Sequence, residues 1–380
     1  MQKMSVHVVH KRLIFGLLIL VFILLGCTKE NKVSPPKEDV DSIKEEPREE
    51  MKAKLPIPVK SDDFNTVSGW LNGDTIVYVT DSNDGSDVYS YQLSSGEQQL
   101  LFDSDAPIVS VLISPSKEYL LIHSSPSSNE ARLTVLTNTG REIFTDRLPS
   151  SELNLEWNLF NENLVLVSTF TEDWNFSVWQ LDIEKGIKSE VHLPQPFGIW
   201  IDRDKLLYLD WDLDAPTLTA QLKQFDIVTG ESQDYLKDIY QVDSFGDFFM
   251  VVAPKPTNDQ EAIYTFYTKK LEEVRSIETP HLTRYSGWLV PHYTYIEATA
   301  QFLTYQPLSS TEADIYHEGF QLVSYDLKTG ERNVIFEGME NEPLSCSPDG
   351  QFCLSGYFFE KLINMESKEI IQVVTEEPLE

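Results

Sequence analysis

The stretch QLVSYDLKTGERNVIF, residues 321–336, contains the pattern from which this chain is built. Apolar and polar residues alternate, a Thr-Gly pair interrupts them, and the alternation resumes, which predicts two antiparallel strands joined by a tight turn. The pattern recurs at residues 88–102, 133–148, 178–193, 223–236, 264–277 and 361–374. Seven hairpins spaced by about 40 to 50 residues predict a radial array of four-stranded sheets.

A second hairpin precedes each of these units and completes four strands per repeat. Its turn is clearest in VSVLISPSKEYLLIH, residues 109–123, and in LSCSPDGQFCLSG, residues 344–356. Proline presets φ at the first central position of such a turn, and glycine tolerates a positive φ later in it. We therefore expect an all-β protein, a β-propeller of four-stranded antiparallel blades. The repeat count gives seven blades, and six is the alternative because the sixth repeat is long and the seventh is short.

A column of residues just before the first turn of the repeats predicts how the strands pair. A two-residue hairpin places positions seven apart opposite each other, so each pair should form a cross-strand apolar contact. The tryptophans would then pack between blades; a carbohydrate-stacking platform is the alternative. The pairs are Trp70 with Val77, Ile113 with Leu120, Trp157 with Leu164, Trp200 with Leu207, Trp288 with Tyr295, and Cys346 with Cys353.

The two cysteines of this column are candidates for a disulfide. Cross-strand partners bring their Cβ atoms within about 4.5–5.5 Å, close enough for a disulfide in a twisted hairpin. In an exported chain we expect Cys346 and Cys353 to be bonded, with two buried thiols as the alternative. Their spacing is not that of a Cys-x-x-Cys redox or zinc motif.

The N-terminus has the features of an export signal. Lys3, Lys11 and Arg12 precede an apolar run over residues 13–25, which is too short to span a bilayer comfortably. The run ends in Leu-Leu-Gly-Cys, which resembles the bacterial lipobox. That resemblance implies a signal peptide over residues 1–26 and a diacylglyceryl group on Cys27, through which the protein would be anchored to the membrane.

The segment that follows predicts a solvated tether and then the folded domain. Residues 28–60 contain no aromatic residue, many charges and five prolines, so they cannot bury a core. We assign residues 27–60 to the lipidated cysteine and a disordered charged tether. Residues 61–380 then form the propeller domain.

The turns of the first hairpins carry a family resemblance. SPSKEYLLI and SPDGQFCLS resemble the Ser-Pro-Asp-Gly repeat of TolB-type propellers. Together with the lipobox and the tether, they make the chain similar to the YqgU-like propeller lipoproteins of Gram-positive bacteria, a group described as six-bladed and without an established activity. The resemblance implies a location on the outer face of the cytoplasmic membrane.

Composition limits the possible partners. The formal net charge of −31 argues against nucleic acid, because phosphate backbones require a basic footprint. It also argues against direct adhesion to anionic lipid. A protein or cell-envelope ligand with a basic patch is the expected partner.

The candidate binding residues lie in the loops predicted for one face of the propeller, the upper face. If each inner strand runs downward, the loops between the second and third strands and the connections between blades lie on this face, and variable loops on a regular scaffold are where function usually resides. These loops combine carboxylates with aromatic residues and histidines. The candidates are Asp84, Asp87, Asp173, Trp174, Asp210, Asp212, Asp214, His292 and His317.

Each candidate also has a plain structural interpretation. The loop with Asp84 can be an ordinary Asn-Asp-Gly hairpin, since its glycine spacing departs from a calcium loop. Asp210, Asp212 and Asp214 alternate and can share a cation or form a solvated strand end. We expect no cofactor and no assigned metal ligand, and the sequence lacks a Gly-x-Ser-x-Gly elbow and a His-Glu-x-x-His motif. A non-catalytic binding or scaffold module is therefore the first hypothesis, and a metal-assisted hydrolase or lyase at the upper mouth of the channel is the alternative.

Overall fold

The structure is a computed structural model that describes residues 52–375 apart from 213, 216, 257 and 286. The predicted signal peptide, Cys27 and most of the predicted tether lie outside the described residues. Within the described part, β-strands account for nearly all regular structure. Two 3₁₀ helices, η1 (Glu297–Thr299) and η2 (Ala313–Ile315), complete it. No helix in this part is long and apolar enough to cross a membrane.

Seven four-stranded antiparallel sheets, here called blades 1 to 7 in chain order, form the described part of the fold. Blade 1 contains β1 (Phe64–Trp70), β2 (Thr75–Ser82), β3 (Gly85–Gln92) and β4 (Gln98–Ser104). Blade 2 contains β5 (Ile108–Ile113), β6 (Tyr119–Ser127), β7 (Glu130–Thr137) and β8 (Glu142–Pro149). Blade 3 contains β9 (Glu152–Trp157), β10 (Leu164–Phe170), β11 (Phe176–Asp182) and β12 (Ile187–Val191). Blade 4 contains β13 (Ile199–Asp202), β14 (Lys205–Asp210), β15 (Ala220–Asp226) and β16 (Glu231–Ile239).

The second half of the chain follows the same plan with one addition. Blade 5 contains β17 (Gln241–Ser244), β18 (Phe248–Lys255), β19 (Asn258–Thr268) and β20 (Glu273–Pro280). Blade 6 contains β23 (Tyr293–Ile296), β24 (Gln301–Pro307), β26 (Phe320–Asp326) and β27 (Arg332–Met339). Blade 7 contains β28 (Leu344–Cys346), β29 (Phe352–Ser355), β30 (Lys361–Asn364) and β31 (Ile370–Gln372). The addition is a three-stranded sheet of β21 (Leu282–Arg284), β22 (Gly287–Leu289) and β25 (Thr311–Glu312).

The seven repeated hairpins are confirmed as the third and fourth strands of the seven blades. Their turns owe their shape to local chemistry. In the quoted stretch the carboxylate of Asp326 accepts hydrogen bonds from the backbone N–H groups of Lys328 and Thr329, both at 2.8 Å. Gly330 then takes φ = +82°, a conformation that side chains with a Cβ disfavour.

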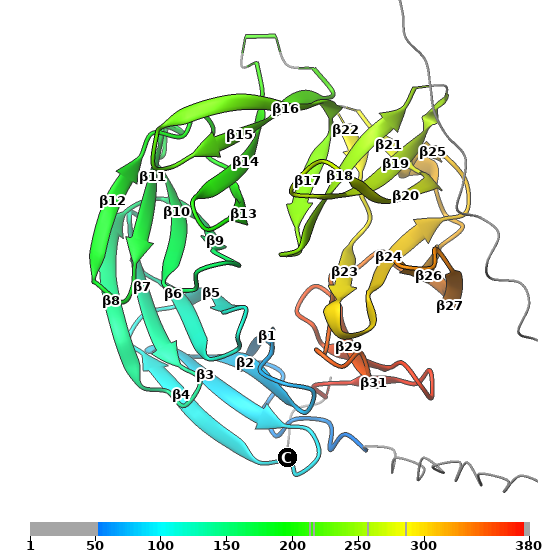
Figure 1. Cartoon of the computed structure of the whole chain (residues 1–380). Helices are drawn as coiled ribbons and strands as arrows, with labels where there is room; N and C mark the ends of the chain where they lie inside the picture. The colour runs from blue at the N-terminus through cyan, green and yellow to red at the C-terminus, as the bar shows by residue number, and fades with distance from the viewer. Residues whose placement is uncertain (1–51, 213, 216, 257, 286, 376–380) are drawn as a thin grey trace, which may run out of the picture. The chain divides into compact units, whose positions relative to one another are not determined.

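Apolar contacts between neighbouring blades hold the fold together. Each of the seven buried apolar clusters joins two blades that are consecutive in the chain or, in one case, blade 7 and blade 1. The blades therefore form a closed ring, and Figure 1 shows first strands such as β5, β9, β13 and β17 toward its centre. Strand β6 illustrates why the middle strands are apolar throughout: Leu120 and Ile122 pack against blade 1, whereas Leu121 packs against blade 3.

The seam between blades 1 and 7 includes a segment that we expected to be part of the tether. Ile57 is only 1% exposed in the apolar cluster of this seam. Its backbone N–H donates to the carbonyl of Val373 at 2.8 Å, and the N–H of Lys54 donates to the carbonyl of Leu93 at 2.7 Å. Residues 54–57 thus link the last blade to the first, so packed structure begins before residue 61.

The column of paired residues is correct for two of its six pairs. Ile113 faces Leu120, and Cys346 faces Cys353, to which it is joined by a disulfide. The other pairings were wrong because the first turns differ in length. Trp70 faces Ile76, Trp157 faces Val165 and Trp200 faces Leu206. All four tryptophans of the column are nevertheless at most 8% exposed, as expected for packing between blades and not for a carbohydrate platform.

The length of the sixth repeat comes from the additional sheet. Trp288 lies on β22 and faces Thr283 of β21, so it belongs to this sheet and not to an inner blade strand. Tyr295 lies on β23 and faces Phe302 instead of pairing with Trp288. An inserted hairpin cannot be distinguished from a blade hairpin by alternation alone, since both strands have the same period.

Candidate functional site

The order of the strands places two sets of loops on one face of the ring. Consecutive antiparallel strands alternate in direction, so the loops between second and third strands lie at the same end as the connections from one blade to the next. This is the upper face defined above. Blades 3 and 4 bring several of the sequence candidates together there.

An exposed aromatic patch lies at the upper end of blade 3. We define it as Phe170, Trp174, Phe176 and Phe197. The indole of Trp174 is 71% exposed and the ring of Phe197 is 60% exposed. Both contact Phe170, with ring centroids 6.0 Å and 5.8 Å from it. Phe170 itself is buried, so the exposed rings are those of Trp174, Phe176 and Phe197. Such a group of exposed rings often marks an interaction site.

Two short loops present these rings. The turn over residues 171–175 is closed by the N–H of Thr171, which donates to the carbonyl of Asn175, and by the N–H of Trp174, which donates to the carbonyl of Thr171, both at 2.9 Å. Trp174 takes φ = +61°, an uncommon conformation for a bulky residue. The connection from blade 3 to blade 4 is held by the hydroxyl of Ser168, which donates to the carbonyl of Pro196.

The aspartates of blade 4 lie beside the same connection. The side-chain amide of Gln195 donates to the carbonyl of Trp211 at 3.1 Å, which joins residues 194–197 to the loop that begins after Asp210, the last residue of β14, and carries Asp212. The patch therefore has Asp173 on one loop and the blade 4 aspartates on the next. Sequence spacing could not reveal this proximity, because it depends on how blades 3 and 4 pack.

The three alternating aspartates do not converge on a shared cation. Asp210 forms an ion pair with Lys223, with 2.8 Å between oxygen and nitrogen. Asp212 accepts hydrogen bonds from the backbone N–H groups of Asp214 and Ala215, at 2.9 Å and 3.1 Å. Across the described residues, no three histidine, cysteine, aspartate or glutamate side chains are arranged to hold a metal ion.

Several carboxylates of this region form no salt bridge within the described part of the chain. Glu172 and Asp173 are exposed and have no salt-bridge partner within the described part of the chain, and the same holds for Asp212 and Asp214. Exposed aromatic rings and unpaired carboxylates thus share one surface. Both groups attract cations, the rings through their π faces and the carboxylates through their charge.

The remaining candidates lie on other blades. Asp84 is exposed in the two-residue turn between β2 and β3 of blade 1, as the hairpin interpretation predicts. Burial, and then repulsion from Asp103, raise the pKa of Asp87 on β3. In blade 6, burial lowers the pKa of His292, and His317 is exposed. These four residues do not join the patch on blades 3 and 4.

Two inner-strand carboxyl groups that the sequence did not single out have shifted pKa values. Burial, together with repulsion from Asp243, raises the pKa of Glu156 on β9 to about 8. Burial likewise raises the pKa of Asp243 on β17, whose carboxylate accepts a hydrogen bond from the hydroxyl of Tyr293 at 3.1 Å. Single carboxylates on separate blades leave no linear motif, which is why spacing could not identify them.

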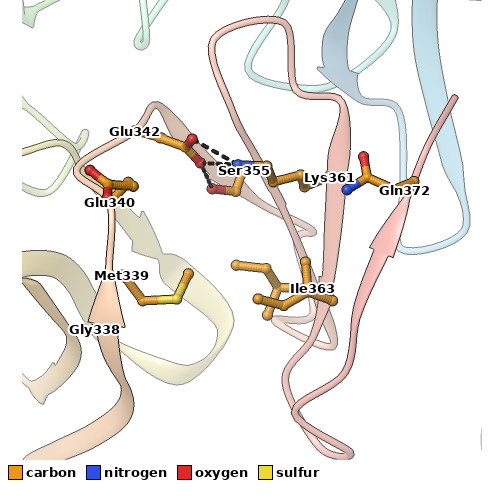
Figure 2. Close-up of a pocket in the computed structure, with 9 residues that line it drawn as sticks. Gly338, Met339, Glu340, Glu342, Ser355, Lys361, Ile363 and Gln372 are labelled. Carbon is orange, nitrogen blue, oxygen red and sulfur yellow. Dashed lines mark hydrogen bonds and ion pairs between the residues drawn. The ribbon is translucent and has the colours of Figure 1, made fainter. Parts of the chain in front are cut away.

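A cavity of about 220 Å³ lies between blades 6 and 7 (Figure 2). Figure 2 shows Lys361 beside Glu342, and its Nζ donates to both carboxylate oxygens at 2.7 Å and 2.9 Å. Met339 and Ile363 supply apolar walls. The charges of Lys361 and Glu342 neutralise each other, and Glu340, which also lines the cavity, adds a carboxylate with no salt-bridge partner among the described residues.

Comparison with known proteins identifies the family to which this chain belongs. A family model described as YqgU-like 6-bladed beta propeller domain matches residues 92–356. The chain belongs to this family. The family description counts six blades, the number that we gave as the alternative, whereas the described residues of this YqgU-like member form seven four-stranded sheets.

Relatives of the YqgU-like chain agree with the fold. The uncharacterized lipoprotein YqgU of Bacillus subtilis (strain 168) is 24% identical over 321 residues, which cover 84% of this chain and 87% of the relative. The crystal structure of the uncharacterized protein lmo1340 from Listeria monocytogenes EGD-e superposes with a TM-score of 0.77 at 21% identity, covering 83% of this chain and 96% of that one. An oligogalacturonate lyase from Vibrio parahaemolyticus gives 0.53 at 13% identity, covering 80% and 89%. At these identities the structural likenesses show the fold alone.

Proposed function

We propose that this protein is an extracytoplasmic lipoprotein, anchored through Cys27, whose propeller binds a basic protein surface without catalysis. The binding site is the aromatic patch on blade 3 together with the exposed carboxylates of Glu172, Asp173, Asp212 and Asp214. The observation that carries the proposal is the contact of the exposed Trp174 and Phe197 rings with Phe170, next to carboxylates that have no cationic partner in the described part of the chain.

The anchor is supported by the sequence and by a relative. The basic residues, the short apolar run and the terminal Leu-Leu-Gly-Cys resemble a lipoprotein signal, and the similar YqgU of Bacillus subtilis is named as a lipoprotein. Two or more acyl chains give stable membrane attachment where one does not. A charged tether after Cys27 would hold the propeller away from the bilayer surface.

The chemistry of the patch supports a cationic partner. A lysine or arginine over the face of an exposed indole gains about 0.5–1 kcal/mol. The neighbouring carboxylates and the net charge of −31 add attraction that steers association and weakens with salt. A metal-assisted hydrolase has no comparable support, because Asp210 forms an ion pair with Lys223 and no three histidine, cysteine, aspartate or glutamate side chains of the described residues are arranged to hold a metal ion.

Site-specific photo-crosslinking on intact cells tests the binding proposal. A photoreactive residue at position 176, within the patch, should capture a protein at a segment rich in lysine and arginine. Position 228 serves as the matched control, because Val228 is 76% exposed on the opposite face of blade 4. Equal capture from both positions, or capture at acidic segments, would contradict the proposal.

The captured partner then allows a quantitative test. Trp174→Ala should weaken its binding to the lipidated protein by tenfold or more, and the association rate should fall as salt rises from low ionic strength. An affinity that neither the substitution nor salt changes would refute the assignment of the patch. Separately, Cys27→Ser should release the protein from the membrane fraction into the medium; retention of this variant would refute the anchor alone.

A further inference from the structure

A second cavity lies between blades 5 and 6 and has a different character. Its volume is about 290 Å³, and Arg275 of β20 and Arg332 of β27 both line it. The remaining walls include Gln306, Tyr325 and two carboxylates, Glu278 and Asp326. Two guanidinium groups around one cavity are unexpected in a chain with a net charge of −31.

The guanidinium of Arg275 is held by backbone oxygens. Its Nε donates to the carbonyl of Leu327 at 3.3 Å, and its Nη2 donates to the carbonyl of Lys328 at 2.8 Å. These bonds fix the group over the β26–β27 turn of the neighbouring blade. No carboxylate of the described residues forms an ion pair with this guanidinium group.

The guanidinium of Arg332 is also held by neutral acceptors. Its Nη2 donates to the side-chain oxygens of Gln306 and Gln321, both at 2.8 Å. Its Nε donates to Gln306 at 3.1 Å and to the hydroxyl of Tyr325 at 3.3 Å. The group is thus oriented by several contacts, none of which neutralises it.

The two carboxylates of the cavity have other partners. Glu278 accepts from Nζ of Lys255 at 2.7 Å. Backbone hydrogen bonds, first of all from Thr329, lower the pKa of Asp326. Neither carboxylate forms an ion pair with an arginine in the described part of the chain, where Nη1 of Arg275 and Nη1 of Arg332 have no hydrogen-bond partner.

The glycine of the neighbouring turn keeps space for the guanidinium of Arg275. A Cβ on Gly330 would lie 2.7 Å from Nη1 of Arg275, closer than real Cβ contacts come. Any larger residue would push the guanidinium out of its place. The turn that joins the two strands of the hairpin at residues 321–336 therefore also shapes this cavity.

We propose that this cavity binds the carboxylate of a small monoanionic molecule, which accepts hydrogen bonds from the free Nη1 groups of Arg275 and Arg332. The planar arginine fork matches a carboxylate, and charge-assisted hydrogen bonds of this kind are among the strongest in proteins. The ligand must be small, because the cavity is below the about 300–1,000 Å³ typical of sites for drug-sized molecules. A monoanion is favoured over a phosphate dianion, because Glu278 and Asp326 would repel two charges more than one.

Titrations of the full-length lipidated protein in detergent test this site. Lactate and gluconate serve as monocarboxylate probes, methyl lactate as the neutral analogue and inorganic phosphate as the dianion. With ¹⁵N-labelled arginine, lactate or gluconate should shift the Nε–H signals of Arg275 and Arg332 with a dissociation constant below about 10 mM. Methyl lactate should leave these signals unchanged, and phosphate should bind more weakly.

Substitutions show whether the arginines form the site. Arg275→Lys and Arg332→Lys keep the charge but lose the fork, so each should raise the dissociation constant by tenfold or more. Arg147→Lys is the matched control, because Arg147 is paired with Glu130 on blade 2 at 2.8 Å and should have no effect. Arg332 is exposed, so its variant tests the site even if replacing Arg275 disturbs the packing between blades 5 and 6.

Several outcomes would overturn the proposal. They are the absence of binding by both carboxylates below about 10 mM, unchanged binding in the lysine variants, equal shifts at Arg147, or tighter binding of phosphate than of the monocarboxylates. Because this cavity lies on blades 5 and 6 and the aromatic patch on blade 3, these results are independent of those for the proposed partner.

Discussion

The indole Nε1–H of Trp70 donates a hydrogen bond to the backbone carbonyl of Ser345 at 2.9 Å, across 275 positions of sequence. Trp70 belongs to the first blade and Ser345 to the last, so this bond lies at the seam where the ring closes. Trp200 makes the corresponding bond to the carbonyl of Glu156 on blade 3 at 3.3 Å. Trp70 and Trp200 therefore connect the inner strands of neighbouring blades by hydrogen bonds as well as by packing.

Replacing Trp70 with phenylalanine should destabilise the closing seam. The substitution removes one hydrogen bond, leaves the carbonyl of Ser345 without that donor and shortens the ring system, at a cost of about 2 kcal/mol in the free energy of unfolding. Urea denaturation followed by circular dichroism measures it. Trp174→Phe is the control and should change stability by less than about 0.5 kcal/mol, because Trp174 is exposed. Equal effects of the two substitutions would show that the seam bond is not stabilising.

The segment before the first blade should contribute to stability although it resembles a linker. Ile57→Ala should lower the free energy of unfolding by about 2–3 kcal/mol, because Ile57 is buried between blades 1 and 7. Ile315→Ala is the matched control on a residue that is 63% exposed. Thermal and urea unfolding of both variants measure the loss of stability. A stability of Ile57→Ala equal to that of the control would mean that residues 54–57 do not close the ring.

Stability should depend on pH through Glu156. Its folded pKa of about 8 lies above its usual value of 4.5, so the folded state binds the proton more tightly than the unfolded state. The stabilisation is complete below pH 4.5 and is lost as pH rises to 8. Glu156→Gln cannot ionise, so at pH 9 it should be more stable than the wild type by at least about 1.4 kcal/mol, the equivalent of one pKa unit.

Two further measurements define that effect. At pH 5 the stabilities of Glu156→Gln and the wild type should differ little, since Glu156 is neutral in the folded protein. Asp243→Asn should lower the pKa of Glu156, because it removes a repelling carboxylate. Stability curves of wild type and Glu156→Gln that run parallel from pH 5 to pH 9 would contradict the burial of this carboxyl group.

The disulfide of blade 7 should stabilise its inner hairpin. Cys346→Ala with Cys353→Ala should lower the free energy of unfolding by about 2–3 kcal/mol, because the crosslink restricts the unfolded chain. A reducing agent should lower the melting temperature of the wild type and leave that of the double variant unchanged. Intact-mass analysis after thiol alkylation provides the direct check. Alkylation of both cysteines in unfolded, unreduced protein would show that the bond is absent.

The sequence by itself determined the repeating unit, because a hairpin is a local structure. Alternation sets the two strands, and residues such as Asp326 and Gly330 set the turn between them through contacts with their immediate neighbours. The cross-strand position of Cys346 and Cys353 followed for the same reason. Seven hairpins, four strands per blade and tryptophans buried between blades could therefore be predicted.

Only the tertiary structure decided which residues meet. Trp174 and Phe197 share a patch, Arg275 and Arg332 share a cavity, and Glu156 is repelled by Asp243, because the packing of strands and loops from different hairpins brings each pair together. The same packing admits Ile57 into the seam and accommodates the extra β21–β22 hairpin. The local alternation of apolar and polar residues cannot predict these contacts, since they depend on the order and closure of the whole ring.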